Sequence, residues 1–295
     1  MLHVADVTKV YRTGLFGRGL HTAVSGVSFD VRRGEIVSLI GESGSGKTTL
    51  GRMILRLTQA TDGSISFDGD DVARLEGGAL RTYYGRVQGV FQDPFSSYNP
   101  VFKVDRVLGM IRANYLGDLS ERDWQTTLRS SLEAVSLEPR DVLGKYPHQL
   151  SGGQLQRLMI ARALLLEIDL LVADEIISML DASTRIDVLN LLGDLKAGGL
   201  GILFVTHDLS LGHYISDRTL ILRRGRIVEQ GPTVKVFSAP RHSYTRMLLS
   251  CVPQLHRKWD AVPVGDVDAD SDPEAGGLVA VDADGDHLVA PEARA

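Results

Sequence analysis

The chain has 295 residues, of which 43% are hydrophobic and 23% charged, so it is long enough to bury a core without covalent staples. Its one cysteine, Cys251, excludes a disulfide framework and any multi-cysteine zinc or iron–sulfur site. No stretch approaches the roughly 18 uninterrupted apolar residues that a membrane helix needs, and the first residues lack the pattern of a signal peptide. We therefore expect a soluble, intracellular chain that can still dock on a membrane protein.

Negative charge is concentrated towards the C-terminus. The formal net charge is −5, but residues 260–295 hold ten acidic residues and one basic residue. The remainder has 27 acidic and 31 basic residues, a net charge of +4. Because residues 260–295 include no aromatic and few bulky apolar side chains, we expect most of this acidic tail to be disordered. The apolar run at 278–281 leaves open a short strand or a docking peptide.

The first part of the chain alternates apolar and polar residues over 4–10, 23–31 and 64–67. A period of two predicts half-exposed antiparallel strands. Residues 35–40, Glu-Ile-Val-Ser-Leu-Ile, are mostly apolar and predict a buried strand, and a helix is expected over Lys47–Leu57. This part should therefore combine an antiparallel sheet with the first strand of a second sheet.

The strand pattern disappears between residues 93 and 150, where Ser120 and Asp123 have the spacing of a capping box at a helix start. Apolar segments at 170–173 and 201–205 then predict two further buried strands. Short apolar strands that alternate with helices indicate a parallel sheet covered on both faces. The pattern predicts an α/β fold with a helical insertion.

Residues 41–48, Gly-Glu-Ser-Gly-Ser-Gly-Lys-Thr, fit the pattern G-x-x-x-x-G-K-S/T between a strand and a helix. We call them the phosphate loop. The glycines let backbone N–H groups turn towards phosphate oxygens, and the helix start adds its positive end. We expect Lys47 on the β- and γ-phosphates and the Thr48 hydroxyl on Mg²⁺. The expected nucleotide contacts here are Gly41, Ser43, Gly44, Gly46, Lys47, Thr48 and Thr49.

A phosphate loop of this kind needs an acid at the end of a second strand for the metal. Asp174 and Glu175 directly follow the apolar segment 170–173. We expect Asp174 to hold the Mg²⁺ shell and Glu175 to act as the general base on the attacking water. Together with Lys47, Glu175 is an expected catalytic residue.

Residues 150–157, Leu-Ser-Gly-Gly-Gln-Leu-Gln-Arg, precede that strand. A serine and two glycines at a helix start form a second anion-binding terminus. The segment and its place resemble the signature of the nucleotide-binding subunits of ATP-binding-cassette (ABC) transporters. The resemblance implies an ABC nucleotide-binding domain: a P-loop NTPase core with a parallel sheet, an antiparallel β subdomain and an inserted α-helical subdomain. In that family the signature closes over the ATP of a partner subunit, which implies nucleotide contacts by Ser151, Gly152, Gly153 and Gln154.

The resemblance also implies roles for isolated residues. Gln92 resembles the glutamine that contacts Mg²⁺ and senses the membrane subunit, and His207 resembles the catalytic histidine at the γ-phosphate. Tyr11 resembles the aromatic residue that stacks on adenine. Asp181 stands where the family has an aspartate that contacts the partner subunit.

Segments 92–100, 146–150 and 242–249 resemble the branch of importers for oligopeptides, dipeptides and nickel, of which some relatives carry sugars. The chain departs from the family at Ile176-Ile177, where Pro-Thr is usual, and at Leu155, where arginine is usual. The first departure leaves open a weakly hydrolysing regulatory subunit paired with an active paralogue. A single phosphate loop and the lack of heptads argue against an ABC ATPase of DNA repair or translation.

The resemblance therefore implies a peripheral ATPase on the cytoplasmic face of the membrane, which uses ATP and Mg²⁺ to power import of peptides or a similar small solute. Its implied partners are a second ATPase subunit (a paralogue or a second copy), two transmembrane permease subunits and, indirectly, an extracytoplasmic solute-binding protein; no nucleic acid is expected. The implied domains are a core with the antiparallel β subdomain and phosphate loop at 1–92, a helical subdomain with the signature at 93–160, the continued core at 161–240, a C-terminal extension at 241–259 and the acidic tail at 260–295.

Overall fold

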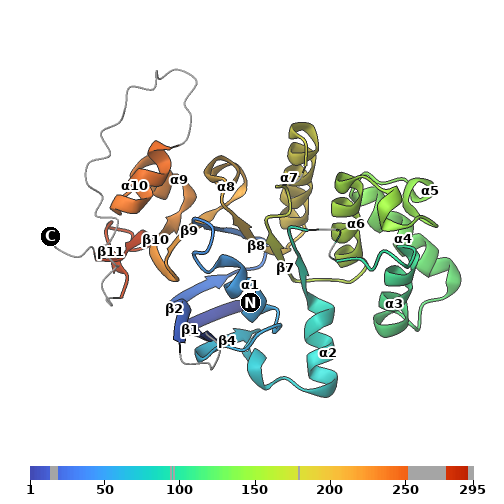
Figure 1. The fold of residues 1–295 in the computed structure, drawn as a ribbon, viewed down its shortest axis with the longest axis horizontal. Coiled ribbons are helices and arrows are strands. Elements are labelled where there is room, and N and C mark those ends of the chain that lie inside the picture. The colour runs from blue at the N-terminus through green and yellow to red at the C-terminus, as the bar shows by residue number, and fades with distance from the viewer. Residues whose placement is uncertain (14–18, 94, 96, 179, 252–276, 292–295) are drawn as a thin grey trace. The chain divides into compact units, whose positions relative to one another are not determined.

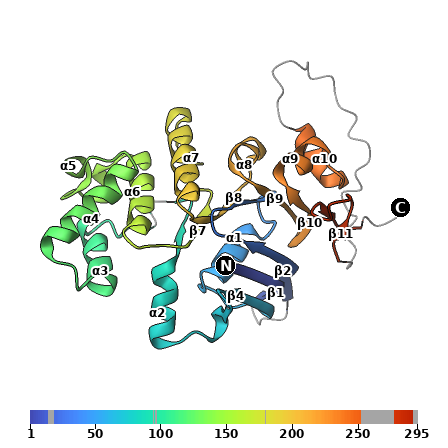
Figure 2. The same cartoon turned by 180° about the vertical axis from the view of Figure 1, so that it is seen from behind.

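The computed structural model describes residues 1–13, 19–93, 95, 97–178, 180–251 and 277–291. The chain divides into two compact units, which are unit 1 (Met1–Arg74 with Leu203–Ala295) and unit 2 (Leu75–Ile202). The elements of each unit can be followed in Figures 1 and 2. Within the described ranges, every helix is too short or too polar to cross a membrane. The five domain ranges implied by the sequence stay a prediction.

Unit 1 contains an antiparallel sheet of four strands. Their order is β2 (Gly19–Val31), β1 (Leu2–Thr13), β4 (Asp62–Phe67) and β5 (Asp70–Asp71). Leu2 of β1 pairs with Val31 on one side and Phe67 on the other, and all three side chains are buried. Every second residue of β2 from Val27 onwards is buried, which confirms the half-exposed antiparallel strands predicted from the alternating pattern.

Unit 1 also holds the strand that leads into the phosphate loop. This strand, β3 (Ile36–Ile40), is buried along its whole length and runs parallel to β9 (Arg218–Arg223), with Leu39 opposite Leu220. An antiparallel partner, β10 (Arg226–Pro232), follows on the other side of β9. The buried β8 (Gly201–Thr206) lies where the chain passes from unit 2 to unit 1.

The helices of unit 1 pack on these strands. They are α1 (Lys47–Ile54), the short η1 (Val72–Arg74), α8 (Leu209–Ile215), α9 (Thr233–Ser238) and α10 (Ser243–Ser250). The helix predicted over 47–57 is present but ends three residues earlier. In both ribbon views α9 and α10 lie side by side next to β10 (Figures 1 and 2).

Residues 277–291 of the acidic tail are ordered, although we expected most of the tail to be disordered. There β11 (Val279–Ala280) and β12 (Leu288–Val289) form a hairpin, and β12 pairs antiparallel with β10, with Val289 opposite Glu229. The prediction was wrong for this segment because its stability comes from an edge strand and from Lys235, both distant in sequence. Residues 260–276 and 292–295 of the tail lie outside the described ranges.

Unit 2 pairs two parallel strands, β6 (Val87–Val90) and β7 (Leu170–Asp174), and apart from the first residues of β8 its other regular elements in the described ranges are helices. The helix α4 begins after Ser120, whose Oγ accepts from the N–H of Asp123, so the predicted helix start is confirmed. The helical elements are α2 (Gly77–Arg86), α3 (Asp105–Tyr115), α4 (Glu121–Ala134), α5 (Pro139–Val142), η2 (Pro147–Gln149), α6 (Gly152–Leu164) and α7 (Ala182–Ala197).

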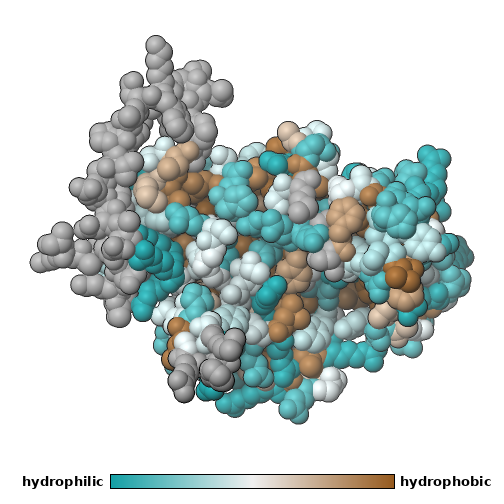
Figure 3. Space-filling view, in the orientation of Figure 1, coloured by the Kyte–Doolittle hydropathy of each residue, from teal (hydrophilic) through white to brown (hydrophobic). Residues whose placement is uncertain are grey.

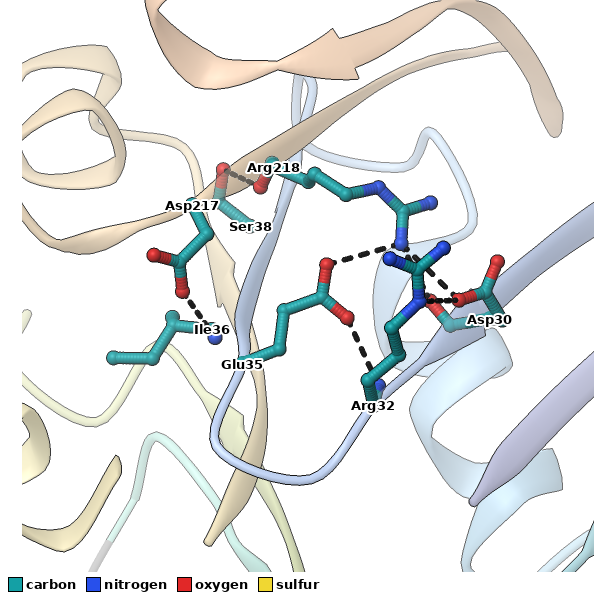
Figure 4. Close-up of polar contacts among 7 residues, drawn as sticks. All are labelled: Asp30, Arg32, Glu35, Ile36, Ser38, Asp217 and Arg218. Carbon is teal, nitrogen blue, oxygen red and sulfur yellow. Dashed lines mark hydrogen bonds and ion pairs between the residues drawn. The ribbon is translucent and has the colours of Figure 1, made fainter. Parts of the chain in front are cut away.

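A polar cluster fixes the start of β3 in unit 1 (Figure 4). The Asp217 carboxylate accepts from the Ile36 N–H at 2.9 Å, and the Glu35 carboxylate accepts from the Arg32 N–H at 2.9 Å. Arg218 Nη1 lies 3.1 Å from Glu35 Oε1. Because β9 begins at Arg218, these contacts hold the starts of β3 and β9 together.

Candidate functional site

The phosphate loop adopts the conformation that its glycines allow. Gly44 and Gly46 have φ values of 82° and 107°, which other residues rarely adopt. A Cβ atom on Gly46 would lie 2.3 Å from the carbonyl oxygen of Ala23 in β2, whereas one on Gly44 would meet no atom within 4 Å. The Gly44 side of the loop is therefore open towards a ligand, and the Gly46 side is pressed against the antiparallel sheet.

Lys47 begins α1 and is 5% exposed. Its Nζ donates to the carbonyl oxygens of Gly41 at 2.7 Å and Glu42 at 2.8 Å. The ammonium group thus closes the loop on itself, at the place where the sequence predicts contact with phosphates. Among the other predicted contacts, Ser43 and Thr48 are exposed and Thr49 is half-buried.

Residues outside the motif hold the loop from below, and sequence reasoning missed them. The Gly225 N–H donates to the Ser45 carbonyl at 2.9 Å, and the Gly225 carbonyl accepts from the Ser25 N–H at 2.8 Å. A Cβ atom on Gly41 would lie 2.2 Å from the carbonyl oxygen of Leu222. The turn between β9 and β10 therefore supports the loop. In the sequence, Gly225 is the one residue of this turn that could have indicated a close approach of the backbone.

The remaining predicted residues of unit 1 are Tyr11 and His207. Tyr11 is half-buried in β1, with Lys9 Nζ 5.0 Å from its ring centroid. His207 is exposed directly after β8, and the next residue, Asp208, caps α8 by accepting from the Ser210 N–H at 2.9 Å. The structure thus places His207 at a strand end, as the sequence predicts.

Asp174 and Glu175 lie at the end of β7 in unit 2. Asp174 is 4% exposed and ends a strand that is buried throughout. Glu175 has a φ of 51°, and its carbonyl accepts from the Ser178 N–H at 3.1 Å and the Ser178 hydroxyl at 2.9 Å. A non-glycine residue in the left-handed region costs about 1–3 kcal/mol, and such strain is concentrated at functional sites.

Ile176 and Ile177, the departure noted in the sequence, follow Glu175 and are 1% and 2% exposed. Both side chains therefore belong to the core of unit 2.

The signature segment begins α6. Ser151 Oγ accepts from the Gln154 N–H at 3.1 Å, and Gln154 Oε1 accepts from the Ser151 N–H at 3.0 Å. This capping box occupies one N–H of the helix start and leaves the exposed Ser151 at the surface. Leu155 is fully buried, in register with other buried residues of the helix, so its side chain packs in the core of unit 2.

Asp181 caps α7, the helix that follows. Its carboxylate accepts from the Thr184 N–H at 3.0 Å, and the hydroxyls of Ser183 and Thr184 donate to it at 2.6 and 2.9 Å. These hydrogen bonds hold the pKa of Asp181 well below its usual range. A Cβ atom on Gly153 would lie 3.8 Å from Thr184 Cγ2, so the starts of α6 and α7 are adjacent.

Gln92 is exposed two residues after β6. The signature helix contacts this strand end, because Arg162 Nη2 of α6 donates to the Gly89 carbonyl at 2.8 Å. Burial raises the pKa of Tyr98, which lies in the same stretch as Gln92, to about 12 and lowers that of Arg162. In unit 2, α6 therefore contacts two other predicted segments. Arg162 contacts the strand that leads to Gln92, and Gly153 lies beside the start of α7, which Asp181 caps.

Comparison with known proteins decides the family. The family described as ABC transporter matches residues 24–178, more than half of the chain. The chain belongs to the ABC transporter family. A second family, described as the oligopeptide/dipeptide transporter C-terminal region, matches residues 228–274. The resemblance drawn from the signature is thus confirmed.

Relatives of this ABC transporter chain are similar over most of their length. A Brucella ovis protein whose name describes peptide import and ATP binding is 44% identical, with 94% of this chain and 87% of that protein covered. The oligopeptide transport ATP-binding protein OppF of Streptococcus mutans is 41% identical, with 83% and 82% covered. The dipeptide transport ATP-binding protein DppF of Escherichia coli is 38% identical, with 87% and 77% covered.

Solved structures agree on the fold. The ATP-binding cassette MJ0796, in a dimeric post-hydrolysis state bound to ADP and Pi, superposes with a TM-score of 0.71 at 28% identity. The match covers 79% of this chain and 99% of that one. The predicted α/β cassette with an antiparallel sheet and a helical insertion is confirmed.

Proposed function

We propose that the chain is the ATP-hydrolysing subunit of an ABC importer for peptides. The observation that carries the proposal is the phosphate loop, with Gly44 and Gly46 in left-handed conformations and Lys47 gripping the loop from within. Successive backbone N–H groups at a helix start bind phosphate oxygens. The family and the names of the relatives support ATP as the nucleotide.

The loop fits a nucleoside triphosphate. Its open face at Gly44 admits phosphate oxygens, and Ser45 Oγ is buried with no hydrogen-bond partner among the described residues. Thr48, Gln92 and Asp174 offer the oxygen donors that Mg²⁺ prefers, so these three residues would hold the ion. The ion would neutralise negative charge on the phosphates.

For hydrolysis, Glu175 would take a proton from the attacking water and orient it in line with the γ-phosphorus. Lys47 would stabilise the charge that develops on the β- and γ-phosphate oxygens, and His207 would contact the γ-phosphate. Positioning and fixed charge therefore supply most of the catalysis. The products are ADP and phosphate.

A second subunit would complete the site. Ser151 and Asp181 are exposed at adjacent helix starts of unit 2, so another chain can reach both residues, together with Gly152, Gly153 and Gln154. The cassette MJ0796 is dimeric when bound to ADP and Pi. We propose the same pairing here, with a paralogue or a second copy, on two permease subunits at the cytoplasmic face of the membrane. A solute-binding protein would deliver the cargo.

Peptides are the proposed cargo because two findings agree. The C-terminal match at 228–274 is to the oligopeptide/dipeptide transporter C-terminal region, and the names of the relatives describe peptide transport. These findings favour peptides over the sugars that some members of the branch carry.

The test is ATP turnover by the full chain assembled with its permeases. Glu175→Gln should abolish phosphate release and leave ATP binding intact, because only the base is removed. The matched control is Glu167→Gln, the same chemical change at an exposed residue of unit 2, which should retain activity. Full turnover by Glu175→Gln would contradict the assignment.

A further inference from the structure

A tyrosine of the C-terminal region contacts the phosphate loop directly. Tyr244, in α10, is 1% exposed, and its Oη accepts from the N–H of Glu42 at 3.4 Å across 202 residues of sequence. The carbonyl of the same Glu42 accepts from Lys47 Nζ at 2.8 Å. Glu42 is therefore hydrogen-bonded through its carbonyl to Lys47 and through its N–H to the Tyr244 hydroxyl.

The Tyr244 ring is fixed from several sides. It belongs to a buried cluster with Ile40, the last residue of β3, and with Val236 of α9. The Arg223 guanidinium carbon lies 4.9 Å from the ring centroid. Apolar residues of α9 and α10 are visible over this part of unit 1 in Figure 3. Since the ring cannot shift freely, its hydroxyl is a stable anchor.

The hydroxyl also remains protonated. Burial and the nearby negative charge of Glu42 raise the pKa of Tyr244 to about 12. At neutral pH the group is therefore a neutral hydroxyl that accepts from the Glu42 N–H and keeps its own proton to donate.

Further hydrogen bonds lead from Tyr244 to the C-terminal hairpin. The Tyr244 N–H donates to His242 Nδ1 at 3.1 Å, and the His242 N–H donates to Glu229 Oε2 at 3.0 Å. Glu229 is fully buried in β10, and its Oε1 lies 2.7 Å from Nε2 of His287 in the hairpin. A buried carboxylate needs such partners, so His287 and the start of α10 stabilise one another through Glu229.

The hairpin is held in place by charge as well. Lys235 Nζ of α9 lies 2.7 Å from carboxylate oxygens of Asp282, Asp284 and Asp286. The Ala290 N–H donates to the Val228 carbonyl at 2.8 Å, beside the β10–β12 pairing. These contacts keep His287 on Glu229.

We propose that Tyr244 is a positioning residue of the phosphate loop, and that the C-terminal hairpin (residues 277–291) influences nucleotide affinity through Glu229, His242 and Tyr244. This inference rests on the nucleotide-binding role proposed for the loop. Tyr244 orients the Glu42 peptide, and the orientation of this peptide sets the shape of the loop that receives the phosphates.

The first experiment compares Tyr244→Phe with wild type in the full chain. The change removes one hydroxyl and keeps the packed ring, so the fold should survive. We expect faster amide exchange in the segment 36–46 and a KM for ATP about 3- to 10-fold higher, as the loss of one hydrogen bond predicts, with kcat changed less than twofold. Tyr84→Phe is the control, because it makes the same chemical change in α2 of unit 2, outside the unit that holds the phosphate loop.

The second experiment tests whether the hairpin acts on the loop through the hydrogen bonds that connect His287, Glu229, His242 and Tyr244. His287→Leu removes the hairpin partner of Glu229 and should raise the KM for ATP by a smaller factor. In the double variant with Tyr244→Phe it should add nothing, because both changes act through the same contact. If the increases in KM for ATP of the two single variants add in the double variant, the hairpin does not act through Tyr244.

The outcomes separate the two proposals. If wild type binds no ATP, the proposed function fails. If wild type binds ATP but Tyr244→Phe matches Tyr84→Phe in exchange and in KM, the role of Tyr244 fails alone.

Discussion

Arg218 Nη1 lies 3.1 Å from Glu35 Oε1 and 3.3 Å from Asp30 Oδ2, so a single guanidinium joins the strand that precedes the phosphate loop to the antiparallel sheet. Glu35 is 8% exposed, whereas the nearby ion pair of Arg32 with Asp30 lies in solvent. The two arginines therefore differ in burial although they share one acidic partner (Figure 4).

Arg218→Met should lower the free energy of unfolding by about 1–3 kcal/mol, since it leaves the buried Glu35 carboxylate without its cation. Arg32→Met should cost less than about 1 kcal/mol, because its ion pair is exposed. Urea unfolding of both variants at neutral pH measures the difference. Equal losses would show that the buried contact adds nothing.

Gly46→Ala and Gly44→Ala separate steric clash from backbone strain. Both residues have positive φ, so either change costs about 1 kcal/mol for conformation alone. At Gly46 the new Cβ would also clash with the Ala23 carbonyl, which raises the expected loss to about 3 kcal/mol or more. Thermal unfolding without nucleotide tests the ranking, and a reversed order would contradict the geometry of the loop.

Asp181→Ala should lower Tm by a few degrees at pH 7 and by less at pH 3. Hydrogen bonds keep the pKa of Asp181 below its usual value of 3.8, so the stability it contributes is complete above that pH, begins to fall below it and is lost fully only when the pH passes the lowered pKa. The measurement is Tm between pH 7 and pH 3. Asp187→Asn, on the exposed face of the same helix, is the control, and its Tm difference from wild type should not shrink as the pH falls.

Lys235→Met should loosen the hairpin 277–291. The three neighbouring carboxylates raise the pKa of Lys235, and its ammonium group lowers the pKa of Asp282. The change leaves these carboxylates without that cation. We expect several-fold faster amide exchange in this segment of the variant than in wild type. In wild type itself, exchange should be faster at 1 M than at 0.05 M salt, because Asp284 and Asp286 are exposed and salt screens their pairing with Lys235. Exchange that is insensitive to both changes would show that strand pairing alone holds the hairpin.

The parts of the site that were predictable are local in sequence. The phosphate loop, the Ser151 cap and the placement of Asp174 at a buried strand end follow from glycine spacing, capping chemistry and apolar runs. Each depends on residues within a few positions of one another. The structure confirms the strand before the loop and the helix after it.

The parts that escaped prediction depend on distant partners. The strand β6 has only four residues and includes Gln88 and Gly89, so no periodic pattern marks it. The hairpin is too polar to be ordered by itself, and its contacts with Glu229 and Lys235 span more than 40 residues. The contact between Tyr244 and Glu42 spans 202 residues, a separation at which no sequence pattern acts.

The pairing of β12 with β10 also covers a sheet edge that could otherwise pair with another copy of the chain. With residues 277–291 removed, the backbone groups of Val228–Gln230 would face solvent as an open sheet edge, and such edges recruit strands from other molecules. A shortened chain would therefore be prone to aggregate at concentrations that the longer chain tolerates.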